Sequence, residues 1–271
     1  MPKEFNGLFT NCFTNNISMD AEKLLEKILN SNKVEDAKGN VYDLNSNLNK
    51  EEGIFIQQLI DKNKPLNTLE IGCAYGVSSL YICSKLPTGS QHIIIDPNQS
   101  TDWKNIGIEN LEKAGLKNFK LYEGPSEIIL PGLLNKGQKL DFALIDGWHT
   151  LDHTLIDFFY INKMLNIGGI VVIDDVAMEG IKKIMRYIIN YPCFKLIDAV
   201  NIKYTLKRKL FHLFIEKPFS FIAGIFPSRI AYRIFASNIV KNEKKLNLNA
   251  SMIALQKTSE DTRPWNWYNE F

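Results

Sequence analysis

The chain has 271 residues, of which 45% are hydrophobic and 23% are charged, and its formal net charge is +2 at pH 7. This length fits one large α/β domain with modest extensions, and a core of that size needs neither disulfides nor structural zinc. The composition argues against a disordered chain, and the small net charge argues against a protein dedicated to binding nucleic acid.

Cysteine usage and the lack of long apolar runs point to a cytoplasmic protein. The four cysteines are Cys12, Cys73, Cys83 and Cys193. They form no CxxC pair and no cluster at zinc spacing, so we expect reduced thiols. The N-terminus shows no basic region followed by an apolar run, so no signal peptide is expected. No run of about 18 apolar residues predicts a transmembrane helix.

Residues 1–49 are expected to form an N-terminal extension. Asp20 is a candidate N-cap for a helix that continues to about Leu29, because leucine and isoleucine follow it at helical spacing. Between Val34 and Leu44, a Lys-Gly-Asn turn separates two short β-prone pieces, and this pattern predicts a hairpin.

From residue 50 onward, predicted helices and strands alternate along the chain. The helices are expected over 50–61, 77–85, 103–114, 126–133, 151–165 and 181–191. The strands are expected over 68–71, 92–95, 119–122, 140–145, 170–173, 194–204 and 250–257. Such alternation is typical of βαβ units and of a parallel sheet covered on both faces. With right-handed crossovers, residues 50–271 should form a doubly wound, mostly parallel, seven-stranded, Rossmann-like α/β domain.

The segment 206–245 interrupts this alternation and is predicted to be a helical insertion before the last strand, broken by Pro218 and Pro227. It holds nine lysines and arginines and two glutamates, so its net charge is about +7 and that of the remaining chain is near −5. It is also rich in phenylalanine and isoleucine. A lid, a contact between copies in a homo-oligomer, an acidic partner and an anionic membrane surface are all open as its role.

Open α/β sheets bind ligands at the carboxyl ends of their strands, so the residues that follow each predicted strand are the candidates. The first strand leads into Gly72-Cys-Ala-Tyr-Gly76, and Glu70 precedes the first glycine by two residues. The two glycines allow a tight turn that approaches a ligand, and a purely structural turn is the alternative. The segment matches neither the dinucleotide fingerprint nor the phosphate loop. The carboxylate of Glu70 suits a ligand with a cationic amino group.

The next two strands end in polar residues that have either binding or capping roles. Asp96 lies where an acid accepts hydrogen bonds from ribose hydroxyls, and its alternative role is to cap the turn that follows. Ser126, after the third strand, is placed to meet the edge of an adenine ring or to cap the helix that begins there.

The fourth and fifth strands bring three carboxylates to the same edge, those of Asp146, Asp174 and Asp175. Clustered acids are costly unless a cation neutralises them, and their oxygens suit Mg²⁺ or another hard divalent cation. The alternative for Asp174 and Asp175 is that one of them caps the segment that follows. His149 follows Asp146 by three residues and suits proton transfer from a substrate hydroxyl, because histidine titrates near neutral pH; a structural histidine is the alternative. His153, one turn further on, is expected on the helix surface.

In this order, the motifs resemble those of class I S-adenosylmethionine-dependent methyltransferases. The similar segments are Leu-Glu70-Ile-Gly-Cys-Ala-Tyr-Gly, Ile-Asp96, Ile-Asp146-Gly-Trp-His149, Gly168-Gly169 and Ile-Asp174-Asp175. The resemblance covers roughly residues 50–205 and the final strand. Within that superfamily the chain resembles the small-molecule O-methyltransferases that act on macrolide and aminocoumarin sugars and, more distantly, catechol O-methyltransferase. The insertion 206–245 has no counterpart in the pattern.

The resemblance implies a set of cofactor-binding residues. Glu70, Gly72 and Gly76 would line the methionine and ribose part of S-adenosylmethionine. Asp96 would hold the ribose hydroxyls, and Ser126 would lie near the adenine.

The resemblance also implies the residues that act on the reacting groups. Asp146, Asp174 and Asp175 would hold the divalent cation. Asp146 would also contact the cofactor and take part in catalysis. His149 falls where the family places its general base.

The function implied is transfer of a methyl group from S-adenosylmethionine to a hydroxyl of a small molecule or glycan, assisted by a divalent cation and a histidine base. One alternative is a metal-independent methyltransferase of the same fold, with His149 as base and the aspartates structural. Another is a non-catalytic protein that binds the cofactor. An NAD-dependent dehydrogenase is disfavoured because its glycine fingerprint is missing. No nucleic-acid partner is expected.

Overall fold

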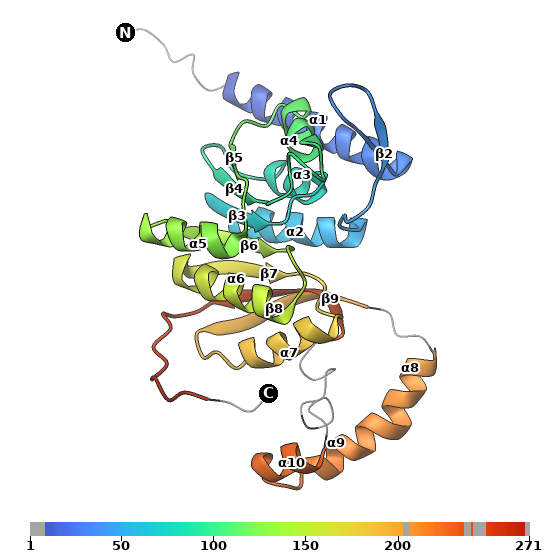
Figure 1. The fold of residues 1–271 in the computed structure, drawn as a ribbon, viewed down its shortest axis with the longest axis vertical. Helices are drawn as coiled ribbons and strands as arrows, with labels where there is room; N and C mark the ends of the chain where they lie inside the picture. The colour runs from blue at the N-terminus through green and yellow to red at the C-terminus, as the bar shows by residue number, and fades with distance from the viewer. Residues whose placement is uncertain (1–8, 203–205, 236–239, 241–247, 269–271) are drawn as a thin grey trace.

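The computed structural model describes residues 9–202, 206–235, 240 and 248–268, and its centre is a seven-stranded sheet (Figure 1). The strand order is β5-β4-β3-β6-β7-β9-β8, and all pairings are parallel except those of β9, which runs antiparallel between β7 and β8. The strands are β3 Asn67–Ile71, β4 Gln91–Ile95, β5 Phe119–Tyr122, β6 Leu140–Ile145, β7 Leu165–Ile173, β8 Phe194–Asn201 and β9 Ala250–Lys257. The predicted doubly wound, mostly parallel α/β sheet is confirmed.

Helices cover both faces of the sheet, because the central strands are apolar on both sides. These helices are α1 Phe9–Ser31, α2 Lys50–Asn63, α3 Val77–Cys83, α4 Ile106–Lys113, α5 Ser126–Asn135, α6 Leu151–Met164 and α7 Glu179–Ile188. Alternate residues of one strand face opposite layers. In β6, Ala143 and Ile145 pack with α5, α6 and α7, whereas Phe142 and Leu144 pack with α2. Helices α1, α3 and α4 complete the second layer.

The start of α2 was predicted correctly from the sequence, whereas the start of α1 was not. Helix α2 begins at Lys50 as predicted, and Asn49 and Glu52 form a reciprocal capping box there. Helix α1 begins well before Asp20, so the predicted cap at Asp20 is wrong: this residue is exposed inside the helix. The residues before it are mostly polar, and apolar spacing therefore does not reveal the first half of the helix.

Backbone conformation explains the late start of α4. A helix was expected from residue 103, but it begins at Ile106. Lys104 and Asn105 have φ angles of 54° and 60°, in the left-handed region that a right-handed helix cannot contain. The preceding residues instead form turns that bring Trp103 against the ring of Tyr75, with centroids 5.1 Å apart.

The predicted hairpin is present, as β1 Lys33–Glu35 paired antiparallel with β2 Val41–Asp43. The insertion is helical, as predicted. Its elements are α8 Leu206–Phe211, a π-helical segment His212–Glu216, α9 Lys217–Ala223 and α10 Ser228–Ile234. Pro218 does not break the chain of helices, because it lies in the first turn of α9. Pro227 does separate α9 from α10. Residues 236–239 and 241–245 of the insertion lie outside the described residues.

We call residues 206–235, the described part of the insertion, the arm. The arm projects away from the sheet and its covering helices (Figure 1). It leaves from the carboxyl edge of the parallel strands, because β8 runs parallel to β7. The residues that flank the whole insertion are hydrogen-bonded to each other: the backbone N–H of Ile202 donates to the carbonyl oxygen of Asn249 at 3.1 Å, and the Asn249 side-chain amide donates back to the Ile202 carbonyl at 2.9 Å. Within the described ranges, no helix is long and apolar enough to span a bilayer.

Candidate active site

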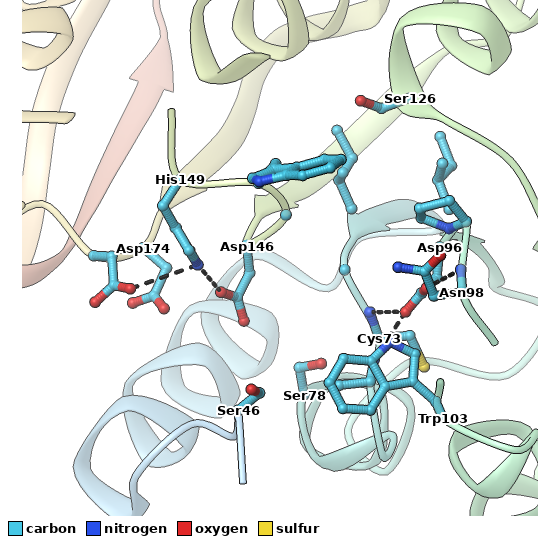
Figure 2. Close-up of a pocket in the computed structure, with 18 of the residues that line it drawn as sticks. Ser46, Cys73, Ser78, Asp96, Asn98, Trp103, Ser126, Asp146, His149 and Asp174 are labelled. Atoms are coloured by element: carbon cyan, nitrogen blue, oxygen red, sulfur yellow. Dashed lines mark hydrogen bonds and ion pairs between the residues drawn. The ribbon is translucent and has the colours of Figure 1, made fainter. Parts of the chain in front are cut away.

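One cavity of about 760 Å³ opens at the carboxyl ends of β3, β4, β6 and β7 (Figure 2). This edge includes the point between β3 and β6 where the strand order reverses, which is where open α/β sheets bind ligands. Seven of the nine residues proposed from the sequence line the cavity. They are Gly72, Asp96, Ser126, Asp146, His149, Asp174 and Asp175. Glu70 and Gly76 do not line it.

The turn after β3 brings the backbone close to the end of β6. Gly72 has a φ of +89°, and a Cβ atom on it would lie 2.0 Å from the carbonyl oxygen of Asp146. Gly76 has a φ of +81°, and its Cβ would lie 2.6 Å from the carbonyl oxygen of Gly107. Both positions therefore require glycine for conformation and for space. Gly76 shapes the start of α3 behind the cavity wall rather than the wall itself.

Replacing Gly72 by alanine is expected to lower the free energy of unfolding by about 2 kcal/mol or more beyond the cost of the positive φ alone. The control is Gly89→Ala, since Gly89 has a similar φ of +86° but a Cβ added to it would meet no atom within 4 Å. Chemical denaturation of both variants measures the difference. Equal losses in the two variants would contradict a close approach of the turn to β6.

Asp96 holds the same turn from the end of β4. Its Oδ2 accepts the backbone N–H groups of Cys73 at 3.0 Å and Ala74 at 2.9 Å, and also the side-chain amide of Gln99 at 3.0 Å. Its Oδ1 accepts the backbone N–H of Asn98 at 2.9 Å. The capping role considered from the sequence is thus present. The carboxylate also lines the cavity, so contact with ribose hydroxyls stays a prediction.

The structure places Glu70 in the sheet interior, away from the cavity. It is fully buried, and the hydroxyl of Ser79 donates to one carboxylate oxygen. The same oxygen lies 3.4 Å from Nε2 of His92, whose Nδ1 is hydrogen-bonded to the hydroxyl of Thr68 at 2.8 Å. The cause is the two-residue period of β3, which turns Glu70 toward α3, on the opposite face from Ile71. Glu70 therefore supports the turn from behind and is not among the residues that line the cavity.

At the other end of the cavity, a histidine lies between carboxylates. Nε2 of His149 is 3.6 Å from Oδ1 of Asp146 and 3.5 Å from Oδ2 of Asp175, as the dashed lines in Figure 2 show. Asp175 has a φ of 52°, so the backbone after β7 turns sharply to present its side chain. The spacing of three residues between Asp146 and His149 brings both side chains to one place, as predicted.

The carboxylates of this cluster are short of positive charge. Burial and the negative charge of Asp174 raise the pKa of Asp146 well above its ordinary value. Burial raises the pKa of Asp174 to about 7. Within the described part of the chain, Oδ1 of Asp174 is buried without a hydrogen-bond partner. A hard divalent cation would relieve all three conditions, so the donor set fits such an ion. With the side chains as they stand, however, no three acidic, histidine or cysteine side chains among the described residues converge on one metal position.

Several cavity residues were not found from the sequence. Ser46 and Glu52 come from the loop and first turn that precede the sheet, and no motif marks them. Trp148 is 71% exposed at the cavity rim and stacks on His153, with ring centroids 5.5 Å apart. His153 was expected on the helix surface, but it also lines the cavity. Its position in the first turn of α6, close to the end of β6, was the available signal.

Ser126 lines the cavity at the start of α5, and Asp157 of α6 lies behind it. Asp157 is 1% exposed, and its Oδ1 has no hydrogen-bond partner within the described residues. Burial raises its pKa from 3.8 to about 6, although a hydrogen bond with Ser126 opposes the shift. The buried carboxyl group therefore holds a proton at mildly acidic pH that an unfolded chain releases.

This raised pKa predicts a loss of stability as the pH rises. The protonated Asp157 contributes its full stabilisation below the ordinary pKa of 3.8, and this is lost as the pH passes through about 6. The variant Asp157→Asn cannot ionise at this position. We expect its unfolding free energy, measured relative to that of the original chain, to rise by about 2 to 3 kcal/mol as the pH increases from about 4 to about 8. Denaturant titrations of both proteins across this range measure it. Parallel stability curves would refute the prediction.

Comparison with known proteins agrees with this architecture. Residues 69–176 match a family model described as a methyltransferase domain. Caffeoyl-CoA O-methyltransferase 2 of Petunia hybrida is 29% identical over 134 residues, and catechol O-methyltransferase B of Danio rerio is 26% identical over 154. The matches cover 48% and 55% of this chain and 54% and 57% of those proteins. The chain thus spans about half the length of the curated relatives it matches.

Solved structures show the same fold. An O-methyltransferase of Bacillus cereus in complex with SAH has a TM-score of 0.55 at 21% identity, over 65% of this chain and 82% of that one. The O-methyltransferase TomG of Streptomyces achromogenes in complex with SAM has a TM-score of 0.54 at 18% identity, over 67% and 83%. The chain therefore has the fold of these O-methyltransferase structures, and residues 69–176 are similar to a methyltransferase domain.

Proposed function

We propose that this protein transfers a methyl group from S-adenosylmethionine to a hydroxyl oxygen of a small molecule or glycan. The observation that carries the proposal is a single cavity, at the point where strand order reverses, that joins two kinds of site. One end has the glycine turn held by Asp96, and the other has His149 between two carboxylates. The similarity to O-methyltransferases named for caffeoyl-CoA and catechol supports a hydroxyl acceptor.

The methyl donor is proposed to bind across the switch point, and it supplies a methyl group activated by a sulfonium ion. Gly72 lets the turn pack closely against the end of β6, which shapes the wall on which the donor is proposed to bind. Asp96 fixes this turn and faces the cavity, where it suits the ribose hydroxyls. Ser126 lies at the start of α5, in place to meet the adenine edge. These residues hold and orient the donor, which converts a bimolecular encounter into an aligned one.

A divalent cation such as Mg²⁺ is proposed to be held by Asp146, Asp174 and Asp175. When bound, it would lower the pKa of an acceptor hydroxyl and help to orient it. The unpartnered Oδ1 of Asp174 and the raised pKa of Asp146 support this assignment. The lack of three converged ligands among the described residues favours the second candidate, a metal-independent methyltransferase in which these aspartates only orient His149.

His149 is proposed as the general base. Its Nε2 takes the proton of the acceptor hydroxyl, and the oxygen then forms a bond to the methyl carbon as the carbon–sulfur bond breaks. The products are the methyl ether, S-adenosylhomocysteine and a protonated histidine. The carboxylates of Asp146 and Asp175, at 3.6 and 3.5 Å, stabilise the positive charge that the ring gains.

Calorimetric titration with S-adenosylmethionine tests the proposed function, and absence of binding would refute it. Binding without transfer to any hydroxyl-bearing acceptor would instead indicate a non-catalytic binding protein. Chelation separates the two catalytic candidates: EDTA is expected to reduce the rate at least about tenfold, with recovery on addition of Mg²⁺, because the ion activates the hydroxyl. A rate unaffected by EDTA would establish the metal-independent candidate.

The proposed setting is the cytoplasm. Cys73, Cys83 and Cys193 are free and buried, as expected for a chain kept in a reducing compartment. The membrane-surface contact considered from the sequence concerns the arm, none of whose described residues lines the cavity.

A further inference from the structure

Among the described residues, half of the exposed large apolar side chains, 13 of 26, lie in the 30 residues of the arm. Most large apolar side chains described in it are at least 40% exposed. The most exposed of those at its centre are Phe221 at 76%, Ile225 at 70% and Phe214 at 67%. Isolated exposed hydrophobic residues need no explanation, but a continuous apolar patch on this scale marks an interaction surface.

This apolar surface is not covered by the chain itself within the described residues. The arm has only a small core of its own, where Ala223 and Ala231 are buried and Phe235 contacts the rings of Phe219 and Phe226 at 6.5 and 6.2 Å. Its helices contact each other, and contacts with the sheet and its covering helices are sparse. The arm also stands apart from them in Figure 1.

The apolar side chains lie on several sides of one helix. Leu213, Phe214 and Ile215 are consecutive and all more than 40% exposed. Consecutive residues point about 100° apart in an α-helix and somewhat less in this π-helical segment, so these three cannot share one narrow stripe. A groove on a protein partner covers one face of a helix, whereas a layer of lipid adapts to several sides. This arrangement favours a soft apolar environment over a rigid groove.

The positive charge of residues 206–245 favours an anionic partner over a second copy of the chain. Residues 206–245 carry nine basic and two acidic residues, and three of the basic ones are consecutive at the start, Lys207, Arg208 and Lys209. Two copies that met through this segment would bring together two charges of about +7, which opposes self-association there. Anionic headgroups neutralise such a charge while the apolar side chains enter the acyl boundary beneath them.

We propose that the arm binds the protein to an anionic phospholipid surface. It lies in the interface with its phenylalanine and isoleucine side chains inserted, and its basic residues contact the headgroups. It does not cross the bilayer, in keeping with the finding that no described helix is long and apolar enough to do so. The inference stands on the arm alone and does not depend on the proposed enzymatic function.

Flotation of the full chain with vesicles tests the proposal. We expect binding to vesicles of phosphatidylcholine mixed with phosphatidylglycerol, and much weaker binding to phosphatidylcholine alone or at high ionic strength. The combined change of Phe214, Phe221 and Ile225 to serine is expected to weaken binding about tenfold or more, because it removes the inserted surface. The matched control is Ile167→Ser, at another apolar side chain that is 59% exposed but lies in β7.

A second variant isolates the charge. Replacing Lys207, Arg208 and Lys209 by serine is expected to weaken binding to anionic vesicles about tenfold or more while leaving the weak binding to neutral vesicles unchanged. Circular dichroism and thermal unfolding confirm that each variant is folded. The proposal is overturned by absence of vesicle binding, by equal binding to neutral and anionic vesicles, or by full binding of the triple serine variant of the apolar residues. A dimer in light scattering that this variant converts to a monomer would assign the surface to a second copy.

Discussion

Replacing His149 by alanine is expected to lower kcat by about 10²- to 10⁴-fold while changing the affinity for S-adenosylmethionine by less than about threefold. The size of the effect is that of removing a positioned general base. The ring lies among the carboxylates at the ends of β6 and β7, whereas the residues proposed to hold the methyl donor lie at the glycine turn and at β4. Single-turnover kinetics with saturating donor, combined with calorimetry, separates the two quantities.

The matched control for this prediction is His153→Gln. Both histidines line the same cavity, but His153 is hydrogen-bonded to Thr150 and stacked on Trp148 rather than held between aspartates. We expect His153→Gln to reduce kcat severalfold at most. A His149→Ala variant that kept its rate, or equal losses in both variants, would exclude His149 as the base.

Changes at Asp96 are expected to have the next largest effect, and two substitutions separate its two roles. Asp96→Ala leaves the buried N–H groups of Cys73 and Ala74 without an acceptor, at a cost of about 1 to 3 kcal/mol each, so both stability and donor affinity should fall. Asp96→Asn keeps an oxygen for one or both N–H groups but loses the charge. Its stability should stay within about 1 kcal/mol of the original, while donor affinity falls about tenfold or more.

Calorimetry with S-adenosylmethionine and chemical denaturation, carried out on both Asp96 variants, measure these outcomes. Since 1.4 kcal/mol corresponds to about a tenfold change in affinity, loss of one charged hydrogen bond to a ribose hydroxyl is detectable. An Asp96→Asn variant that binds the donor as tightly as the original chain would show that Asp96 only caps the turn.

Strand-end residues were predictable because a parallel sheet gathers them at one edge. The sequence placed Asp96 after one strand and Asp146 and His149 after another, and the fold brings them to one cavity. The spacing of three residues was enough to predict that Asp146 and His149 approach each other, since a single turn sets it. What local spacing could not decide was whether Asp96 caps or binds, because one carboxylate can do both.

Glu70 is a predicted site residue that does not line the cavity. The motif around it suggested contact with a ligand, but β3 turns alternate side chains to opposite faces, and α3 covers this one. A strict count along the strand places Glu70 on the face opposite to Ile71, which lines the cavity. Ser46 and Glu52 show the opposite limit. Ser46 reaches the cavity from the loop before α2 and Glu52 from the first turn of α2, and tertiary packing places both of them there.

The hydrogen bonds between Ile202 and Asn249 have a consequence for the architecture as a whole. They close the insertion at its base, so β8 and β9 already form a continuous antiparallel pair without it. Such a segment can be gained or lost without a change in strand order, register or the cavity. Its sequence can therefore diverge under different constraints from those on the core. The same closed base makes the arm suitable for transfer to another enzyme of this fold, where it would carry its binding preference with it.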